Sequence, residues 1–98
     1  MAETAVRTYL VPFWPGVKRL APAGANDCGD LDGVPETVIQ VKRCKSMALA
    51  AWVDEACHQA VNAGKPLAVV IHWRRGKGNP GDWYVTMKAS DFVRGWRP

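Results

Sequence analysis

The sequence predicts one α/β domain built on a mixed sheet, with the element order α-β-β-β-α-β and a small β-α addition at the C-terminus. Three observations predict this class. The length of 98 residues suits a single core. Amphipathic helical segments alternate with short runs rich in β-branched residues. An apolar run over 67–71 follows the longest helical segment, as in a βαβ crossover.

The first element is a helix that we expect to end near Leu10, because Pro12 cannot continue it. Glu3 shares the apolar stripe of this helix, so we expect its carboxylate at the rim of the core. The segments 17–20 and 27–31 are candidates for short strands. A turn at Asp32-Gly33-Val34-Pro35 then leads into a stronger strand over 37–43.

Ser46 is a suitable N-cap and predicts a helix from there to about Ala63, where a Gly-Lys-Pro sequence ends it. The run over 67–71 is apolar throughout, which is typical of a strand covered on both faces. After a basic, glycine-rich loop, residues 83–87 alternate as a fifth strand. Ser90 is expected to cap a short final helix.

Charge is distributed unevenly along the chain. Residues 1–41 contain three basic and five acidic side chains, a balance of −2, whereas residues 42–98 contain ten and four, a balance of +6. A protein that holds a divalent cation beside a polyanion needs such an arrangement. Ordinary scatter of solvated charge would produce the same counts, so the pattern alone does not decide between the two.

Composition excludes several classes of protein. The longest apolar run, over 47–53, is far shorter than the roughly 20 residues of a membrane-spanning helix. The start MAET has no basic segment followed by an apolar one, so we expect no secretory signal and a cytoplasmic location. Three cysteines without a CxxC pair suit reduced thiols, and their spacing does not match a zinc site.

The central strand carries polar side chains on one face. A two-residue period places Val38, Gln40 and Lys42 on one face and Ile39 and Val41 on the other. An amide and an ammonium on a covered face need partners, because an unpaired buried polar group costs roughly 1–3 kcal/mol. A carboxylate or a set of metal-bound ligands would satisfy both groups.

The segment GDLDGVPETVIQVK resembles the core motif of the PD-(D/E)XK nuclease superfamily, with Asp30 at the end of one strand and Gln40-x-Lys42 on the next. The predicted element order is similar to the restriction-endonuclease-like core of that superfamily. The whole chain resembles the small Holliday junction resolvase-type endonucleases of bacteriophages. The resemblance covers nearly all 98 residues and implies a single nuclease-like domain over 1–98.

The resemblance implies a Mg²⁺-dependent catalytic site, in which Mn²⁺ can substitute. Asp30 would be the main metal ligand, with the Gln40 side-chain oxygen and the Val41 backbone carbonyl beside it. Glu3 would approach the metal from the first helix. Lys42 would orient or deprotonate the attacking water and stabilise charge on the phosphate. Mg²⁺ prefers such hard oxygen ligands and needs only one or two carboxylates plus the substrate phosphate.

Two residues depart from the superfamily's motif. Gly29 stands where the motif has proline, and Gln40 replaces an acidic residue. The second change removes one negative charge and should weaken metal binding. Glu3 or Asp32 would then have to compensate.

The motif also sets a geometric requirement. If Asp32-Gly33 formed a two-residue hairpin, Asp30 and Gln40 would lie roughly 16 Å apart, which no single ion bridges. The site therefore requires a longer loop through Pro35 or Glu36, or a bulge that bends Asp30 back.

The loop over 74–81 places three cations and three glycines between tryptophans. Arginine and lysine neutralise phosphates, glycines allow close approach, and the flanking rings Trp73, Trp83 and Tyr84 can stack on exposed bases. A solvated hairpin tip with Trp83 in the core would have the same composition. The DNA-contact candidates are Arg74, Arg75, Lys77, Arg43 and Lys45, with Arg94 and Arg97 as further phosphate candidates. The acidic pair Asp54 and Glu55 is expected on a solvated helix face.

The predicted function is that of a metal-dependent, structure-selective DNA endonuclease that hydrolyses phosphodiester bonds at branched DNA such as Holliday junctions. A four-way junction has two-fold symmetry, so a homodimer with two active sites would suit it. The alternatives are a non-catalytic DNA-binding protein on a nuclease fold, which Gln40 makes possible, and a nicking or flap nuclease. Without a metal site, Asp30 would be a turn residue and Lys42 the first exposed residue of a charged loop.

Overall fold

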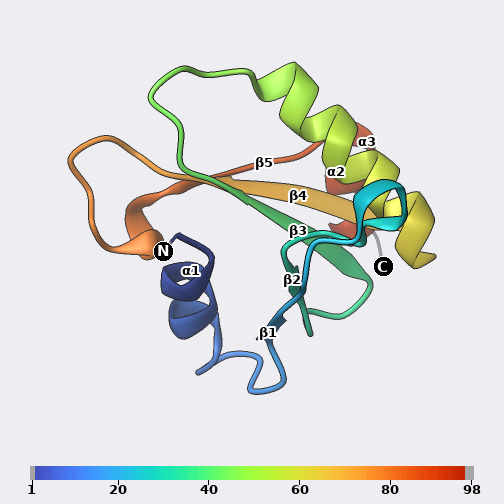
Figure 1. The fold of residues 1–98 in the computed structure, drawn as a ribbon, viewed down its shortest axis with the longest axis horizontal. Helices are drawn as coiled ribbons and strands as arrows, with labels where there is room; N and C mark the ends of the chain where they lie inside the picture. The colour runs from blue at the N-terminus through green and yellow to red at the C-terminus, as the bar shows by residue number, and fades with distance from the viewer. Residues whose placement is uncertain (1, 97–98) are drawn as a thin grey trace.

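A computed structural model describes residues 2–96 and shows a mixed five-stranded sheet with α2 on one face and α1 on the other (Figure 1). The predicted α/β class with a mixed sheet is confirmed. In chain order the elements are α1 (Ala2–Leu10), β1 (Lys18–Arg19), the 3-10 helix η1 (Gly24–Asn26), β2 (Leu31–Asp32), β3 (Thr37–Lys42), α2 (Leu49–Ala63), β4 (Leu67–His72), the 3-10 helix η2 (Pro80–Asp82), β5 (Tyr84–Thr86) and α3 (Ala89–Trp96).

The sheet has the strand order β1-β2-β3-β4-β5. The central pair β3 and β4 is parallel, and every other neighbouring pair is antiparallel. Helix α2 joins the two parallel strands, so the predicted βαβ crossover is present. No helix within residues 2–96 has both the length and the apolar character needed to cross a membrane.

The two faces of the sheet bury separate apolar clusters. Ile39 and Val41 of β3 join a cluster with Val6 and Leu10 of α1, whereas Val38 joins a cluster formed with α2. The predicted two-residue period of β3 is therefore confirmed. It follows that the side chains at 40 and 42 leave the strand on the α2 face.

The predicted N-caps of α2 and α3 are wrong. Helix α2 begins at Leu49, and the N-cap residue is Ala48, which makes no side-chain cap bond. Burial of Trp52, whose backbone N–H donates to Ala48 O at 3.0 Å, fixes the helix start instead of the Ser46 hydroxyl. Ser90 lies inside α3, because that helix already begins at Ala89.

Each predicted strand overlaps a strand of the structure, but the bounds differ, and the strand predicted over 67–71 extends to His72. The segment 27–31 contributes only its last residue to β2, because Asp27 forms a local turn in which its Oδ1 accepts from Gly29 N at 2.9 Å. The segments 17–20 and 83–87 are shortened to Lys18–Arg19 and Tyr84–Thr86. Local side-chain bonding to the backbone competes with strand pairing at such positions.

The connection between β2 and β3 is the longer loop that the motif requires. Leu31 pairs with Ile39, so Asp30 falls opposite Gln40, and Asp30 N donates to Ile39 O at 2.9 Å. Glu36 in this loop adopts a positive φ of 59°. A two-residue hairpin is therefore excluded, and with it the separation of roughly 16 Å that such a turn would impose.

Gly29 is the residue that turns the chain away from β3 just before Asp30. Its φ is 105°, and an added Cβ would lie 2.8 Å from Val38 Cγ1 and 3.1 Å from Ile39 O. Proline, whose φ is fixed near −65°, cannot adopt this conformation.

We expect Gly29→Ala to lower the free energy of unfolding by about 2–4 kcal/mol, because backbone strain and a steric clash add together. Gly76→Ala is the matched control, since its φ is 80° but nothing lies within 4 Å of an added Cβ. The control should lose only about 1–2 kcal/mol, the backbone contribution. Urea unfolding measures both values, and equal losses would contradict the proposed clash.

Candidate functional site

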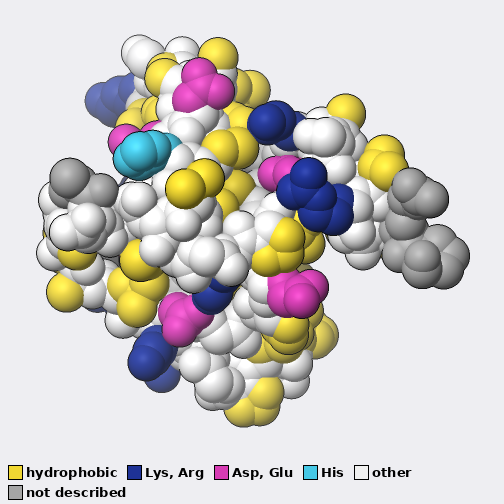
Figure 2. Space-filling model, turned by 90° about the vertical axis from the view of Figure 1, so that its right-hand side faces the viewer, with side chains coloured by type: hydrophobic (Ala, Val, Ile, Leu, Met, Phe, Trp, Pro, Cys, Tyr) yellow, Lys and Arg dark blue, Asp and Glu magenta, His cyan; other side chains and the backbone are white. Residues whose placement is uncertain are grey.

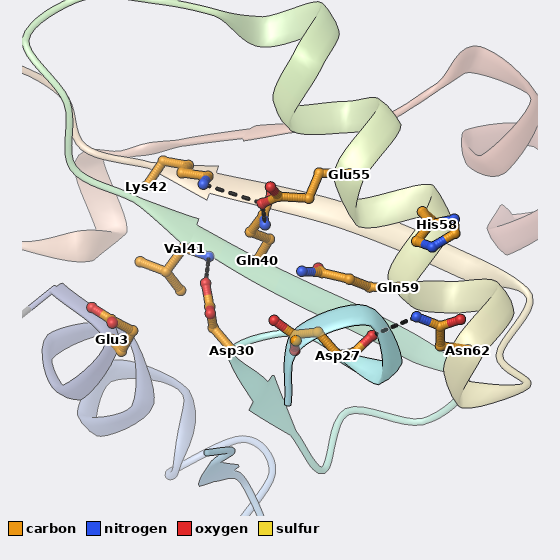
Figure 3. Close-up of a pocket in the computed structure, with 11 residues that line it drawn as sticks. Glu3, Asp27, Asp30, Gln40, Val41, Lys42, Glu55, His58, Gln59 and Asn62 are labelled. Carbon is orange, nitrogen blue, oxygen red and sulfur yellow. Dashed lines mark hydrogen bonds and ion pairs between the residues drawn. The ribbon is translucent and has the colours of Figure 1, made fainter. Parts of the chain in front are cut away.

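A polar pocket of about 420 Å³ opens where β2 leaves β3, between α1 and α2 (Figure 3). Its lining brings together side chains from both faces of the sheet, because β3 has a free edge beyond the point where β2 turns away. The lining residues are Glu3, Gly24, Asp27, Asp30, Gln40, Val41, Lys42, Glu55, His58, Gln59 and Asn62. Every residue that the motif assigned to the metal site or to catalysis is among them.

The Asp30 carboxylate occupies the position at the free edge of β3 where a neighbouring strand would otherwise accept a backbone hydrogen bond. Its carboxylate Oδ2 accepts the backbone N–H of Val41 at 2.7 Å. Burial raises the pKa of Asp30 and the nearby Glu3 carboxylate raises it further, against the lowering effects of the Val41 bond and of Lys42. Burial therefore outweighs the effects that lower the pKa of Asp30, and a further positive charge beside it would favour the ionised carboxylate.

Gln40 lines the pocket and has a buried side-chain oxygen without a partner among the described residues. The residue is 2% exposed, and its Nε2 donates to a carboxylate oxygen of Glu55. The amide oxygen Oε1 can only accept a hydrogen bond, and it has no donor among the described residues. Gln59, 5% exposed, has an Oε1 in the same condition. Two buried carbonyl oxygens without partners are unfavourable unless a ligand or water satisfies them.

Glu55 makes contacts that the sequence analysis did not predict. Its side chain is 52% exposed, as expected for a solvated helix face, but it lies 3.2 Å from Lys42 Nζ and also accepts from Gln40. A signal was available, because the amide of Gln40 and the ammonium of Lys42, on one face of β3, were expected to need a carboxylate or metal-bound ligands as partners. Glu55 lies one helical turn before the buried Gln59, on the side of α2 that covers β3. Its neighbour Asp54 is exposed, as predicted.

Of the two residues expected to compensate for the negative charge missing at position 40, only Glu3 lines the pocket. Glu3 of α1 lines the pocket, half-buried at its rim as expected from its place on the helix stripe. Asp32 does not line it, because its carboxylate pairs with Lys65 Nζ. The hydrogen bond from Lys65 is the main cause that lowers the pKa of Asp32. Asp32 is therefore unsuited to replace the charge lost at position 40.

The pocket is negative within a positive protein. Four carboxylates, those of Glu3, Asp27, Asp30 and Glu55, face one ammonium, that of Lys42, which leaves a formal charge of −3 among its lining residues. The chain as a whole carries +4. A concave region of opposite sign concentrates cations.

The donor set fits Mg²⁺ better than a transition metal. Among residues 2–96, no three His, Cys, Asp or Glu side chains come close enough together to hold a metal ion by themselves. Asp30, the free Gln40 oxygen and backbone carbonyl oxygens are hard ligands, and Mg²⁺ retains several waters in such sites. A zinc site would require a closed set of nitrogen or sulfur ligands.

The basic residues predicted to contact DNA lie in two loops that begin at the same end of the sheet. Lys42 pairs with His72 in the parallel ladder, so the loops that follow β3 and β4 begin side by side. The Arg43 guanidinium lies 4.9 Å from the centre of the Trp73 ring, and that of Arg74 lies 5.6 Å from the Tyr84 ring. Arg75, Lys77 and Lys45 are exposed in the same loops.

Among the aromatic side chains near the basic loop, Trp83 follows the alternative in which it joins the core. Trp83 packs against the core cluster, and its Nε1 donates to Lys77 O at 2.8 Å, so it closes the loop from inside. Tyr84 is the exposed ring beside it. Arg94 donates to Pro66 O at 2.7 Å and so anchors α3. Arg97 lies outside the described residues.

Comparisons with protein-family models, with curated proteins and with solved structures find no match to this chain. The resemblance to PD-(D/E)XK nucleases therefore depends on the motif and on the order of elements.

We expect Asp30→Asn to stabilise the metal-free protein at neutral pH. The pKa of Asp30 is raised in the folded state, so the wild type loses stability as pH rises from the unfolded-state value through the folded pKa. Asparagine avoids this loss and retains an oxygen for Val41 N–H.

Asp32→Asn is the matched control with the opposite sign. The pKa of Asp32 is lowered by Lys65, so its contribution is present at neutral pH and is lost as pH falls. Thermal unfolding in EDTA across the acidic to neutral range measures both variants. Destabilisation by Asp30→Asn at neutral pH would show that the carboxylate serves the fold.

Proposed function

We propose that the chain is a metal-dependent DNA endonuclease of the PD-(D/E)XK type that hydrolyses phosphodiester bonds in branched DNA. The observation that carries this proposal is the convergence of Glu3, Asp30, Gln40 and Lys42 on one negative pocket. The unpartnered Gln40 oxygen and the formal charge of −3 among the lining residues support a bound cation.

The residues that would hold Mg²⁺ are Asp30, Gln40 through Oε1, and Val41 through its carbonyl, with Glu3 facing them. The N–H and C=O of one strand residue point to the same side, and Val41 N–H points to Asp30, so the carbonyl is directed toward the same edge. When bound, the ion would lower the pKa of a water molecule and neutralise charge on the phosphate.

Lys42 provides the second charge for the reaction. Its ammonium stands on the pocket side of β3, where it can donate to the attacking water and to a phosphate oxygen. Glu55 holds this ammonium in place by the contact at 3.2 Å. Glu55 also restores, from α2, the carboxylate that the motif lacks at position 40.

The basic loops support DNA as the substrate. Arg43 and Arg74 extend from the same end of β3 and β4 as Lys42, so a phosphate backbone held by them would pass the pocket. Branched DNA is proposed from the resemblance to junction resolvases, and paired cuts across its two-fold axis would require two copies of the chain.

The test is cleavage of a labelled four-way junction, a flap and a linear duplex in Mg²⁺, Mn²⁺ or EDTA. We expect cutting only with metal and preferentially at the junction. Lys42→Ala should reduce the rate by about 10²–10⁴-fold, the usual contribution of a group acting on proton transfer. Asp30→Asn should abolish cutting while DNA binding persists. Binding without cutting in every metal condition would favour the non-catalytic alternative, and cutting only at the flap would favour a flap nuclease.

Glu55 and Asp54 form a matched pair within this assay. Glu55→Gln should slow cutting by about 10–100-fold, as expected for a residue that positions a catalytic group. Asp54→Asn removes the same charge from the adjacent, exposed position and should leave the rate unchanged. Equal effects would mean that only the charge of the helix matters.

Replacing Arg74, Arg75 and Lys77 together by alanine should flatten the salt dependence of DNA binding. Each lost phosphate contact changes the slope of log K against log salt by about 0.9. The control replaces Lys18, Arg19 and Lys88, which are exposed elsewhere, so that the total charge is matched. Filter binding at several salt concentrations gives the slopes. An unchanged slope in the loop variant would exclude the loop from the interface.

A further inference from the structure

The polar pocket continues past the residues assigned to catalysis, toward the C-terminal end of α2. Lys42 and Gln40 of β3 both contact Glu55 of α2. Gln59 lies one helical turn after Glu55 and lines the same pocket. Figure 3 shows its side chain extending from α2 into the space between Gln40 and Asp27. The proposed reaction assigns no role to this end of the pocket.

Asp27 and Gln59 both lie against Gly29. Asp27 Oδ1 accepts from Gly29 N at 2.9 Å. Gln59 Oε1 lies 3.8 Å from the position that a Cβ on Gly29 would take. Asn62 Nδ2 donates to Asp27 O at 3.0 Å, which holds this turn against α2. A carboxylate from the turn before β2 and an amide oxygen from α2 are therefore neighbours across one glycine.

Both groups have acceptor capacity that the protein does not use. Gln59 is 5% exposed, and its Oε1 has no donor among the described residues. A carboxylate has about four acceptor sites, so the bond from Gly29 leaves most of those on Asp27 available. A buried carbonyl oxygen without a partner is unfavourable. The ligand that satisfies this pair must be a cation or a group that donates hydrogen bonds.

Negative charge remains in the pocket after a catalytic ion is counted. One divalent cation would reduce the formal charge of −3 among the lining residues to −1. Elsewhere Asp32 pairs with Lys65, and on the face shown in Figure 2 acidic side chains lie singly among basic ones. Lys42, the one cation among the described lining residues, pairs with Glu55. Asp27 therefore has a negative charge that favours a cation as the ligand.

We propose that Asp27 and Gln59 hold a second divalent cation, separate from the ion at Asp30, which joins the turn before β2 to α2. Carboxylate and amide oxygens suit a hard ion such as Mg²⁺ or Mn²⁺, whose remaining ligands are water. Asp30 follows this turn directly, so the ion would fix the position of the segment that carries the main catalytic carboxylate. The inference goes beyond the proposed function, because it assigns a structural ion to residues that the reaction does not use.

Titration of the DNA-free protein with Mn²⁺ tests this site by counting bound ions, with calorimetry and electron paramagnetic resonance as the measurements. We expect two ions per wild-type chain, of which Asp30→Asn retains one. Gln59→Leu should weaken the second ion by at least about tenfold, the lower end of what a supporting group contributes at a metal site. Asp27→Asn should have the same effect, since it keeps an oxygen for Gly29 N–H but loses the charge.

Gln59→Glu reverses the direction of the effect. The added charge should tighten the second ion by at least about tenfold, because a divalent cation then meets one more unit charge at contact distance. This variant also serves as the comparison if circular dichroism shows that Gln59→Leu does not fold. Asp54→Asn is the matched control, because it removes a charge from an exposed position on α2 outside the pocket and should leave both ions bound.

The outcomes separate this inference from the proposed nuclease activity. A wild type that binds one ion, lost in Asp30→Asn, would overturn the second site and leave the proposed function standing. A second ion that neither Asp27→Asn nor the Gln59 variants affect would also overturn it, because the ion would then lie elsewhere. Two ions that respond as expected would support the site even if the protein cuts no DNA. Binding of no ion by the wild type would overturn both proposals.

Discussion

The hydrogen bond from Val41 N–H to the Asp30 carboxylate is the contact on which the site depends. It stands where β2 has ended, so a side chain occupies the place that a strand would otherwise fill at the edge of β3. A continuous β2 would satisfy the Val41 backbone and close this edge. Because the edge stays open, side chains from the α1 face and the α2 face reach one pocket. The short β2 is therefore a condition of the site.

The features of the site that depend on short-range geometry within the chain could be predicted from the sequence. The period of β3 placed Gln40 and Lys42 on one face, and the resemblance to the motif, combined with chain geometry, required a longer loop before β3. The start of α2 could not be predicted in the same way, because burial of Trp52, a tertiary contact, overrides the capping preference of Ser46. The length of β2 likewise depends on the turn at Gly29. The positive φ of this glycine cannot be predicted from the residue type, because glycine also adopts negative φ values.

Glu55 shows why the site was only partly predictable. A helix pattern separates apolar from polar positions, but it does not distinguish a polar side chain in water from one that faces a polar partner. The need for a carboxylate partner could be inferred from Gln40 and Lys42 on β3, whereas the residue that provides it, Glu55, lies on α2. Only the packing of α2 across β3 joins the two. Prediction from one sequence fails at contacts of this kind, which join elements far apart in the chain.

The charge distribution bears on both the proposed metal ion and the proposed DNA substrate. A formal −3 among the pocket's lining residues would repel a phosphate, while the arginines and lysines of the adjacent loops would attract the rest of the backbone. DNA could therefore be held beside the pocket without its scissile phosphate entering. A divalent cation at Asp30 would reduce the negative charge by two and remove most of this repulsion. In the proposed function the cation would therefore act twice, first by admitting the phosphate and then by activating the water that attacks it.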